Sequence, residues 1–122
     1  MAKAGPVGLS HLRVTLSDTF YVGPGRADLM ELIAETGSIS EAARRMGMSY
    51  KRAWSLVQAL NDGFGAPLIE TARGGKDQGA SLTEAGREVL ERYRGMQEAT
   101  RRAITRDVEA LAALHADMSQ RK

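Results

Sequence analysis

The spacing of apolar residues along the chain changes period several times, and each change predicts a different element. Residues 11–16 alternate apolar and polar side chains as a half-buried strand does, and residues 20–22 are expected to return as the second strand of a hairpin. A Gly-Pro-Gly turn cluster at 23–25 ends this hairpin. Apolar residues then fall at helical spacing over 27–35, which predicts a first helix that ends at Gly37.

Two short helices are predicted next, separated by a glycine. Ser38 begins the first as part of a capping box: its side chain accepts from the backbone while the Glu41 carboxylate reaches back. Gly47 ends that helix after about two turns. Ser49 is a good N-cap for the second helix, which continues to Leu60 and stops at the Asn-Asp-Gly run that follows.

This pair of helices has the pattern of a helix-turn-helix unit. Ala43 is small where the helices must cross, and Gly47, four residues later, can adopt the positive φ that the turn requires. The apolar residues that fall on the inner faces are Ile39, Ala42, Met46, Met48, Ala53 and Leu56. The second helix is therefore expected to present its N-terminal end to a DNA major groove.

A second hairpin follows, with strands at 67–71 and 80–82. Its Gly-rich loop carries Arg73 and Lys76, so the hairpin is predicted to be the basic wing of a winged helix-turn-helix, reaching the DNA backbone or minor groove. The order of elements and the position of the charges both favour that fold.

From Thr83 a helical pattern runs to about Met118, weakened only at Gly86 and Gly95. A helix of about 35 residues is roughly 50 Å long, more than a domain of this size can bury. The apolar positions predicted to form a dimer seam are Leu90, Tyr93, Ile104, Val108, Leu111 and Leu114. A two-fold dimer would set two recognition helices about 34 Å apart; the alternative is a helix that folds back over its own hairpin in a monomer.

The predicted fold class is therefore mainly α with a small β wing: a winged helix-turn-helix plus a long C-terminal dimerisation helix. The expected organisation is a flexible N-terminus at 1–11, the DNA-binding domain at 12–82, the dimerisation helix at 83–118 and a tail at 119–122.

Composition narrows the class of protein. The 122 residues contain 43% hydrophobic and 26% charged side chains, with no apolar run near the ~20 residues of a membrane span and no apolar core of a secretory signal. Cysteine is absent, and His11 and His115 are far apart, so we expect a cytoplasmic protein without disulfides, metal or cofactor.

The distribution of charge is more informative than its total. The net charge is only +2, but the basic residues are 13 Arg against 4 Lys, and four of them lie between residues 44 and 52 with no acid among them. These are Arg44, Arg45, Lys51 and Arg52. Phosphate is the usual partner of such a patch, although a solvated helix face would show the same pattern.

Double-stranded DNA is the expected partner. The predicted contacts are Ser38, Arg44, Ser49, Tyr50, Lys51, Arg52 and Ser55 on the helix pair, with Arg73 and Lys76 on the wing. For Tyr50 a DNA contact and a structural role are both open. Trp54 is expected to pack against the domain, because its indole buries a large apolar area.

Several of these segments together resemble a known family. Residues 37–43 and 48–54, read as Gly-Ser-Ile-Ser-Glu-Ala-Ala and Met-Ser-Tyr-Lys-Arg-Ala-Trp, resemble the N-terminal domain of bacterial ModE-type molybdate-responsive regulators. Residues 67–76 and 82–86 are similar to that family's wing and to the start of its dimer helix, and more loosely to LysR-type regulators. The resemblance covers roughly residues 12–93.

The resemblance implies a homodimer that binds a palindromic operator. The residues that the resemblance implies contact the operator are Ser49, Tyr50, Lys51, Arg52, Arg73 and Lys76. Full-length members also carry C-terminal β-domains that bind molybdate, whereas this sequence ends at Lys122. Molybdate binding is therefore not expected of these residues, and a truncated piece or a partner that supplies the sensor would give the same sequence.

The sequence disfavours one other class of function and leaves a second open. Gly74-Gly75-Lys76 is not a phosphate-binding P-loop, because Glu70 and Asp77 occupy positions that need Gly and Ser or Thr. No catalytic constellation stands out, so an enzyme is not expected. The stronger alternative is a helical protein-interaction adaptor with no direct DNA readout, whose binding would not need Lys51 and Arg52 and would not weaken with salt as phosphate binding must.

Overall fold

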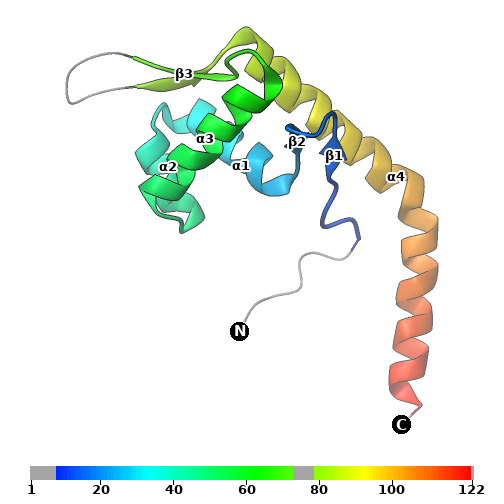
Figure 1. The fold of residues 1–122 in the computed structure, drawn as a ribbon. Helices are drawn as coiled ribbons and strands as arrows, with labels where there is room; N and C mark the ends of the chain where they lie inside the picture. The colour runs from blue at the N-terminus through cyan, green and yellow to red at the C-terminus, as the bar shows by residue number, and fades with distance from the viewer. Residues whose placement is uncertain (1–7, 73–78, 122) are drawn as a thin grey trace.

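The computed structural model describes residues 8–72 and 79–121 and contains a cluster of helices with two small hairpins and one long helix (Figure 1). In chain order the elements are β1 (Val14–Thr15), β2 (Tyr21–Val22), α1 (Pro24–Thr36), α2 (Ile39–Met46), α3 (Tyr50–Phe64), β3 (Ile69–Thr71), β4 (Ala80–Leu82) and α4 (Glu84–Gln120). This is the predicted winged helix-turn-helix with a long C-terminal helix. Part of the predicted flexible N-terminus lies outside the described residues.

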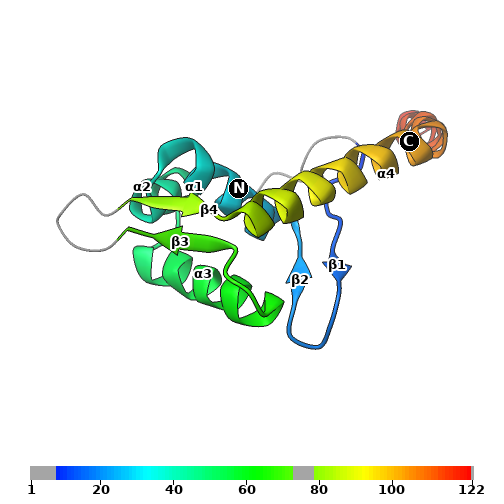
Figure 2. The ribbon, with the colours of Figure 1, turned by 90° about the horizontal axis from the view of Figure 1, so that it is seen from above.

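The core lies where α1, α2 and α3 meet the two hairpins and the first turns of α4. Seen from above, β3 and β4 lie across the cluster, with α1 and α2 on one side of them and α3 on the other, and the β1–β2 hairpin lies beside α4 (Figure 2). The largest fully buried side chains are Leu29, Met30, Ile33, Val57, Leu60, Leu68 and Tyr93. The wing strands lie against this core, because Ile69, Ala80 and Leu82 are buried as well.

The first helix begins earlier than the sequence pattern predicted. The Gly-Pro-Gly cluster was expected to be a turn, yet Pro24 is the first residue of α1 and Gly23 is its extended N-cap, with φ of −136°. Proline suits this position because its φ is already helical and its missing N–H has no partner within the helix. The predicted end is confirmed, since Gly37 adopts a left-handed φ of 69° and donates to the Ile33 carbonyl.

Both hairpins are antiparallel and shorter than predicted. In the first, Val14 pairs with Val22 and Thr15 with Tyr21. In the wing, Ile69 pairs with Leu82, and the register continues to Thr71 opposite Ala80. The wing strand begins at Ile69 rather than at residue 67, because the Leu68 backbone is used instead by Asn61 and by Thr83.

Helix α3 passes through the Asn-Asp-Gly run that was predicted to end it. The Asn61 side chain accepts from the Leu68 and Ile69 N–H groups at 2.8 and 3.0 Å and donates to the Ile69 carbonyl at 2.9 Å. These bonds satisfy backbone groups at the start of β3 and keep Asn61 within the helix. Gly63 fits because a Cβ there would collide with the Thr19 carbonyl. The helix ends instead at Gly65, where φ is 86°.

Helix α4 is joined tightly to the domain at its start. Thr83 caps it by accepting from the Gly86 N–H at 3.0 Å. A Cβ on Gly86 would overlap the Leu68 carbonyl, so the glycine permits a close approach of the two backbones, whereas Gly95 faces open space. Arg94 then bridges to α1, with its Nη2 2.8 Å from an Asp28 carboxylate oxygen.

Beyond this attachment α4 leaves the domain and changes direction part of the way along (Figure 1). Thr100 and Thr105 donate their hydroxyls to the carbonyls of Met96 and Arg101, four residues earlier, at 2.7 and 2.8 Å. Such bonds often bend helices, and Gly95 lies one turn before them. None of the helices in residues 8–72 and 79–121 is both long and apolar enough to cross a membrane.

Candidate nucleic-acid interface

The turn between α2 and α3 is fixed by its own hydrogen bonds. Gly47 adopts a left-handed φ of 70°, and its N–H and that of Met48 donate to the carbonyls of Arg44 and Ala43 at 3.1 and 3.0 Å. These two bonds form a Schellman motif that closes α2. Ser49 then caps α3 by accepting from the Arg52 N–H at 3.1 Å. The predicted helix-turn-helix geometry is confirmed at these residues.

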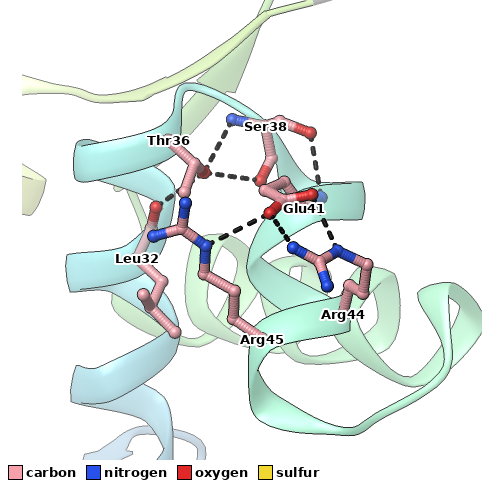
Figure 3. A network of polar contacts seen from close by, with 6 residues as sticks. All are labelled: Leu32, Thr36, Ser38, Glu41, Arg44 and Arg45. Carbon is pink, nitrogen blue, oxygen red and sulfur yellow. Dashed lines mark hydrogen bonds and ion pairs between the residues drawn. The ribbon is translucent and has the colours of Figure 1, made fainter.

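The predicted capping box at the start of α2 is only half formed (Figure 3). The Ser38 Oγ accepts from the Glu41 N–H at 3.0 Å as expected. The Glu41 carboxylate does not return to the Ser38 N–H, which donates instead to the Thr36 hydroxyl at 3.2 Å. The reason is that two arginines one turn later, Arg44 and Arg45, compete for that carboxylate and hold it.

This ion-pair cluster divides the predicted basic patch. Hydrogen bonds from Arg44 and then from Arg45 lower the pKa of Glu41 to about 2, and the same carboxylate raises the pKa of Arg44. Glu41 is therefore charged at neutral pH and offsets one of the two arginines. Lys51 and Arg52, by contrast, are exposed on α3 and form no ion pair within the described part of the chain.

The exposed residues at the start of α3 form one surface. Ser49, Lys51, Arg52 and Ser55 are all exposed. Because the Ser49 oxygen accepts the capping bond, its hydroxyl proton remains free to donate outward. Here the surface offers two cations and two hydroxyls on the end of the helix that a major groove admits.

Two aromatic side chains extend this surface along α3. The rings of Tyr50 and Trp54 stack with centroids 6.4 Å apart and an interplanar angle of 11°. Tyr50 is 54% exposed and Trp54 is 38% exposed, so the expected packing of Trp54 is at the rim of the domain and not in its core. The reason is that Ala53 and Val57 already occupy the buried face of α3, which leaves Trp54 at its edge.

A hollow of about 260 Å³ lies beside these rings, between α2, α3 and the base of the wing. The residues that line it are Ser38, Ile39, Ser40, Tyr50, Trp54, Thr71, Gly79 and Ala80. The structure thus brings two predicted contacts, Ser38 and Tyr50, to one place. Arg73 and Lys76, the predicted wing contacts, lie outside the described residues.

Three residues of this surface were missed from the sequence: Ser40, Trp54 and Thr71. Ser40 and Thr71 join it only because the wing folds back beside α2, and no local pattern reports that contact. Trp54 had a usable signal, since it lies four residues after Tyr50 and therefore on the same helix face. No group of His, Asp or Glu suited to a metal ion occurs in residues 8–72 and 79–121.

The predicted dimer seam of α4 divides into a buried and an exposed part. Tyr93 is 0% exposed, and its hydroxyl donates to the Leu12 carbonyl at 2.6 Å, so it belongs to this chain's own core and not to a partner surface. Burial also raises the pKa of Tyr93. Leu90 packs partly against the same core.

The later seam residues are more accessible. Ile104 and Val108 are half-buried beside Leu9 of the N-terminal segment. Leu111 and Leu114 are 65% and 51% exposed on the part of the helix that leaves the domain. Two neighbouring leucines one turn apart are therefore left uncovered by the described residues.

Comparisons with known proteins agree with this geometry. Residues 27–87, from α1 to the first turn of α4, match the family described as bacterial regulatory helix-turn-helix protein, lysR family. The DNA-binding domain of CbnR in complex with DNA has a similar structure, with a TM-score of 0.57 and 30% identity. That likeness covers 71% of this chain and 95% of the CbnR domain.

Two curated relatives are similar in sequence. MopB of Rhodobacter capsulatus, named a molybdenum-pterin-binding protein, is 48% identical over 73 residues, covering 59% of this chain and 27% of MopB. ModE of Escherichia coli K12, named a DNA-binding transcriptional dual regulator, is 37% identical over 83 residues, covering 67% of this chain and 32% of ModE. The chain thus spans less than a third of the length of these relatives.

Proposed function

Because this chain belongs to the LysR family of bacterial regulatory helix-turn-helix proteins, we propose that it is a sequence-specific DNA-binding transcription regulator and not an enzyme. The observation that carries the proposal is the surface of α3, where Lys51 and Arg52 are exposed beside the Tyr50–Trp54 pair and have no acidic partner in residues 8–72 and 79–121. The names of ModE and of the CbnR–DNA complex support the same activity. Such a regulator would act in the bacterial cytoplasm, where the DNA is.

In the proposed complex α3 enters the major groove by its N-terminal end. Arg52 can donate a planar pair of N–H groups to a guanine edge or a phosphate, while Lys51 acts as a point charge on the backbone. Ser49 and Ser55 add hydroxyl donors on the same side. The helix supplies the readout, and the phosphates supply most of the affinity.

The hollow beside Trp54 would face the DNA strand that passes between the recognition helix and the wing. Its hydroxyl groups, from Ser38, Ser40 and Thr71, suit phosphate oxygens, and the indole offers an apolar face to a deoxyribose. This places Trp54 among the residues that position the duplex.

We also propose a homodimer on a palindromic operator, which the exposed part of α4 supports. Leu111 and Leu114 are large apolar side chains on a helix that projects from the domain, and a second copy is the natural cover for them. Two-fold pairing would present two recognition helices to two half-sites.

DNA binding is tested by fluorescence anisotropy on a duplex selected from a random pool, at about 50 and 200 mM salt. Wild type should select a symmetric sequence and bind it more weakly at the higher salt. Lys51→Ala with Arg52→Ala should reduce the slope of log K against log salt by about 1.8, if each side chain meets one phosphate. Arg106→Ala, which removes an exposed charge from α4, is the control. Equal binding by the double variant and wild type would favour the adaptor alternative.

Dimerisation is tested separately by sedimentation equilibrium. Leu111→Asp with Leu114→Asp should convert a dimer to a monomer without unfolding the domain, because both side chains are already exposed. Glu109→Gln, two residues before Leu111 on the same helix, should leave the mass unchanged. A wild-type protein that stays monomeric across the concentration range would refute the dimer and leave the DNA surface in place.

A further inference from the structure

Two arginines outside the surface at the start of α3 enclose one tyrosine. The Arg13 Cζ lies 3.7 Å from the centroid of the Tyr21 ring, and the Arg26 Cζ lies 3.8 Å from it. Two guanidinium groups cannot share one face of a ring at that distance, so the ring lies between them. Arg13 immediately precedes β1, and Arg26 lies in the first turn of α1. The stack therefore joins the N-terminal hairpin to the first helix.

The two guanidinium groups stack on the ring through their faces. Most of the N–H donors at their edges have no acceptor within the described residues. Arg26 donates one bond, from Nη1 to the Tyr21 carbonyl at 3.2 Å, and its Nε is buried without a partner in the described structure. Arg13 is exposed and makes no hydrogen bond to residues 8–72 or 79–121. Donors without a partner favour a ligand that supplies an acceptor.

The charge of this pair is also not neutralised locally. Neither Arg13 nor Arg26 forms an ion pair with any residue that the structure describes. Asp28, two residues after Arg26, is held by Arg94 at 2.8 Å. The first turn of α1 contains no acidic side chain. An incoming anion would thus meet two positive charges that no carboxylate of the described residues already pairs with.

We propose that Arg13 and Arg26, held on the two faces of Tyr21, form a binding site for a phosphate-type oxyanion. Each guanidinium presents a planar fork of N–H donors, which matches two oxygens of such an anion, and the ring between the two groups keeps both positive charges at one place on the surface. The oxyanion is either a phosphate of the DNA backbone or a free inorganic anion, and the chemistry of the site is the same for both.

The first arm of the test uses inorganic phosphate alone. The melting temperature of the wild-type protein is measured against phosphate concentration, with potassium chloride at matched ionic strength as the reference. A saturable rise above the chloride reference is expected, because a ligand that binds the folded state stabilises it. Arg13→Gln should abolish the rise, and Arg13→Lys, which keeps the charge but not the fork, should weaken it several-fold. Tyr21→Phe, which keeps the ring, and Arg106→Gln should retain it.

Arg13→Gln is the main variant because Arg13 makes no hydrogen bond in the described structure, so the fold does not depend on one. Arg26→Gln repeats the test from the other face of the ring, and circular dichroism checks that each variant is folded. A variant that unfolds is replaced by its Lys counterpart, for which a several-fold weaker response is the supporting result.

The second arm measures duplex binding at several salt concentrations. Unlike the first arm, it rests on the proposed function. If the anion is a DNA phosphate, Arg13→Gln should lower the salt slope by about 0.9 relative to Arg106→Gln. A phosphate response with an unchanged slope identifies a free anion. The proposal is overturned if Arg13→Gln and Arg106→Gln agree in both arms. Failure of the wild type to bind any duplex would refute the proposed function and leave the phosphate arm to decide this site.

Discussion

Replacing Glu41 should strengthen DNA binding, because this carboxylate occupies both arginines at the end of α2. In Glu41→Gln the charge that holds Arg44 and Arg45 is lost, and at least one guanidinium fork becomes free to meet a phosphate. The cap of α2 should survive, since the Ser38 side chain bonds to the Glu41 backbone and not to its carboxylate. The variant therefore changes charge at an interface without removing the helix that carries it.

The size of the effect follows from counting phosphate contacts. One additional contact steepens the slope of log K against log salt by about 0.9, which amounts to about 3.5-fold in affinity between about 50 and 200 mM salt. Two freed arginines would give about twice that change in slope. Anisotropy titrations at four salt concentrations resolve a difference of this size.

The matched control is Glu35→Gln. It alters net charge by the same amount on exposed α1, but Glu35 holds no arginine in the described structure. If Glu41→Gln steepens the slope and Glu35→Gln does not, release of the arginines is the cause. If the two variants have the same slope, Arg44 and Arg45 do not reach DNA and the predicted contact at Arg44 is wrong.

Other consequences of the structure can be measured as stability. In chemical denaturation, Gly95→Ala should be more stable than wild type by up to about 1 kcal/mol, because alanine has the higher helix propensity. Gly86→Ala should be less stable, because its Cβ would meet the Leu68 carbonyl. Equal effects of the two substitutions would contradict the close approach at Gly86. Tyr93→Phe should cost about 1 kcal/mol by losing its buried hydrogen bond, and an unchanged midpoint would contradict that bond. Asn61→Leu should cost at least about 2 kcal/mol, because two backbone N–H groups lose their acceptor; a loss below 1 kcal/mol would show that water replaces it. The pKa of Glu41 is about 2 in the folded protein, below its ordinary 4.5, so the stabilisation that its carboxylate gives is complete above pH 4.5 and disappears as the pH falls toward 2. The melting temperature of Glu41→Gln should therefore change less with pH than that of wild type over this window.

The end of α1, both ends of α2 and the start of α3 could be predicted because they depend on nearby residues. Gly37 and Gly47 adopt positive φ, and Ser38 and Ser49 accept backbone N–H groups three residues ahead. Each of these requirements is visible in a few letters of sequence. The same holds for the long helix, whose pattern has no strong breaker after Thr83.

The errors arose where two explanations share one pattern. Tyr93 has the spacing of a dimer seam, but the same helix face packs against the domain at its start, and periodicity cannot say where one role ends and the other begins. The Glu41 carboxylate had three possible partners within one turn: the Ser38 N–H and the side chains of Arg44 and Arg45. It binds the two charged side chains. Whether the Trp54 side chain lies in the core or at the rim depended on how much of the buried face of α3 its smaller neighbours occupy.

The attachment of α4 has a consequence for which operators a dimer could occupy. Gly86 against Leu68, and Arg94 against Asp28, fix the direction in which this helix leaves the domain. A rotation of about 10° at the base of a helix roughly 50 Å long moves its far end by about 9 Å, several base-pair steps along a duplex. In the proposed dimer, the number of base pairs between half-sites would therefore be set inside each subunit's core. Substitutions there would change the preferred operator spacing while every DNA-contacting side chain stayed the same.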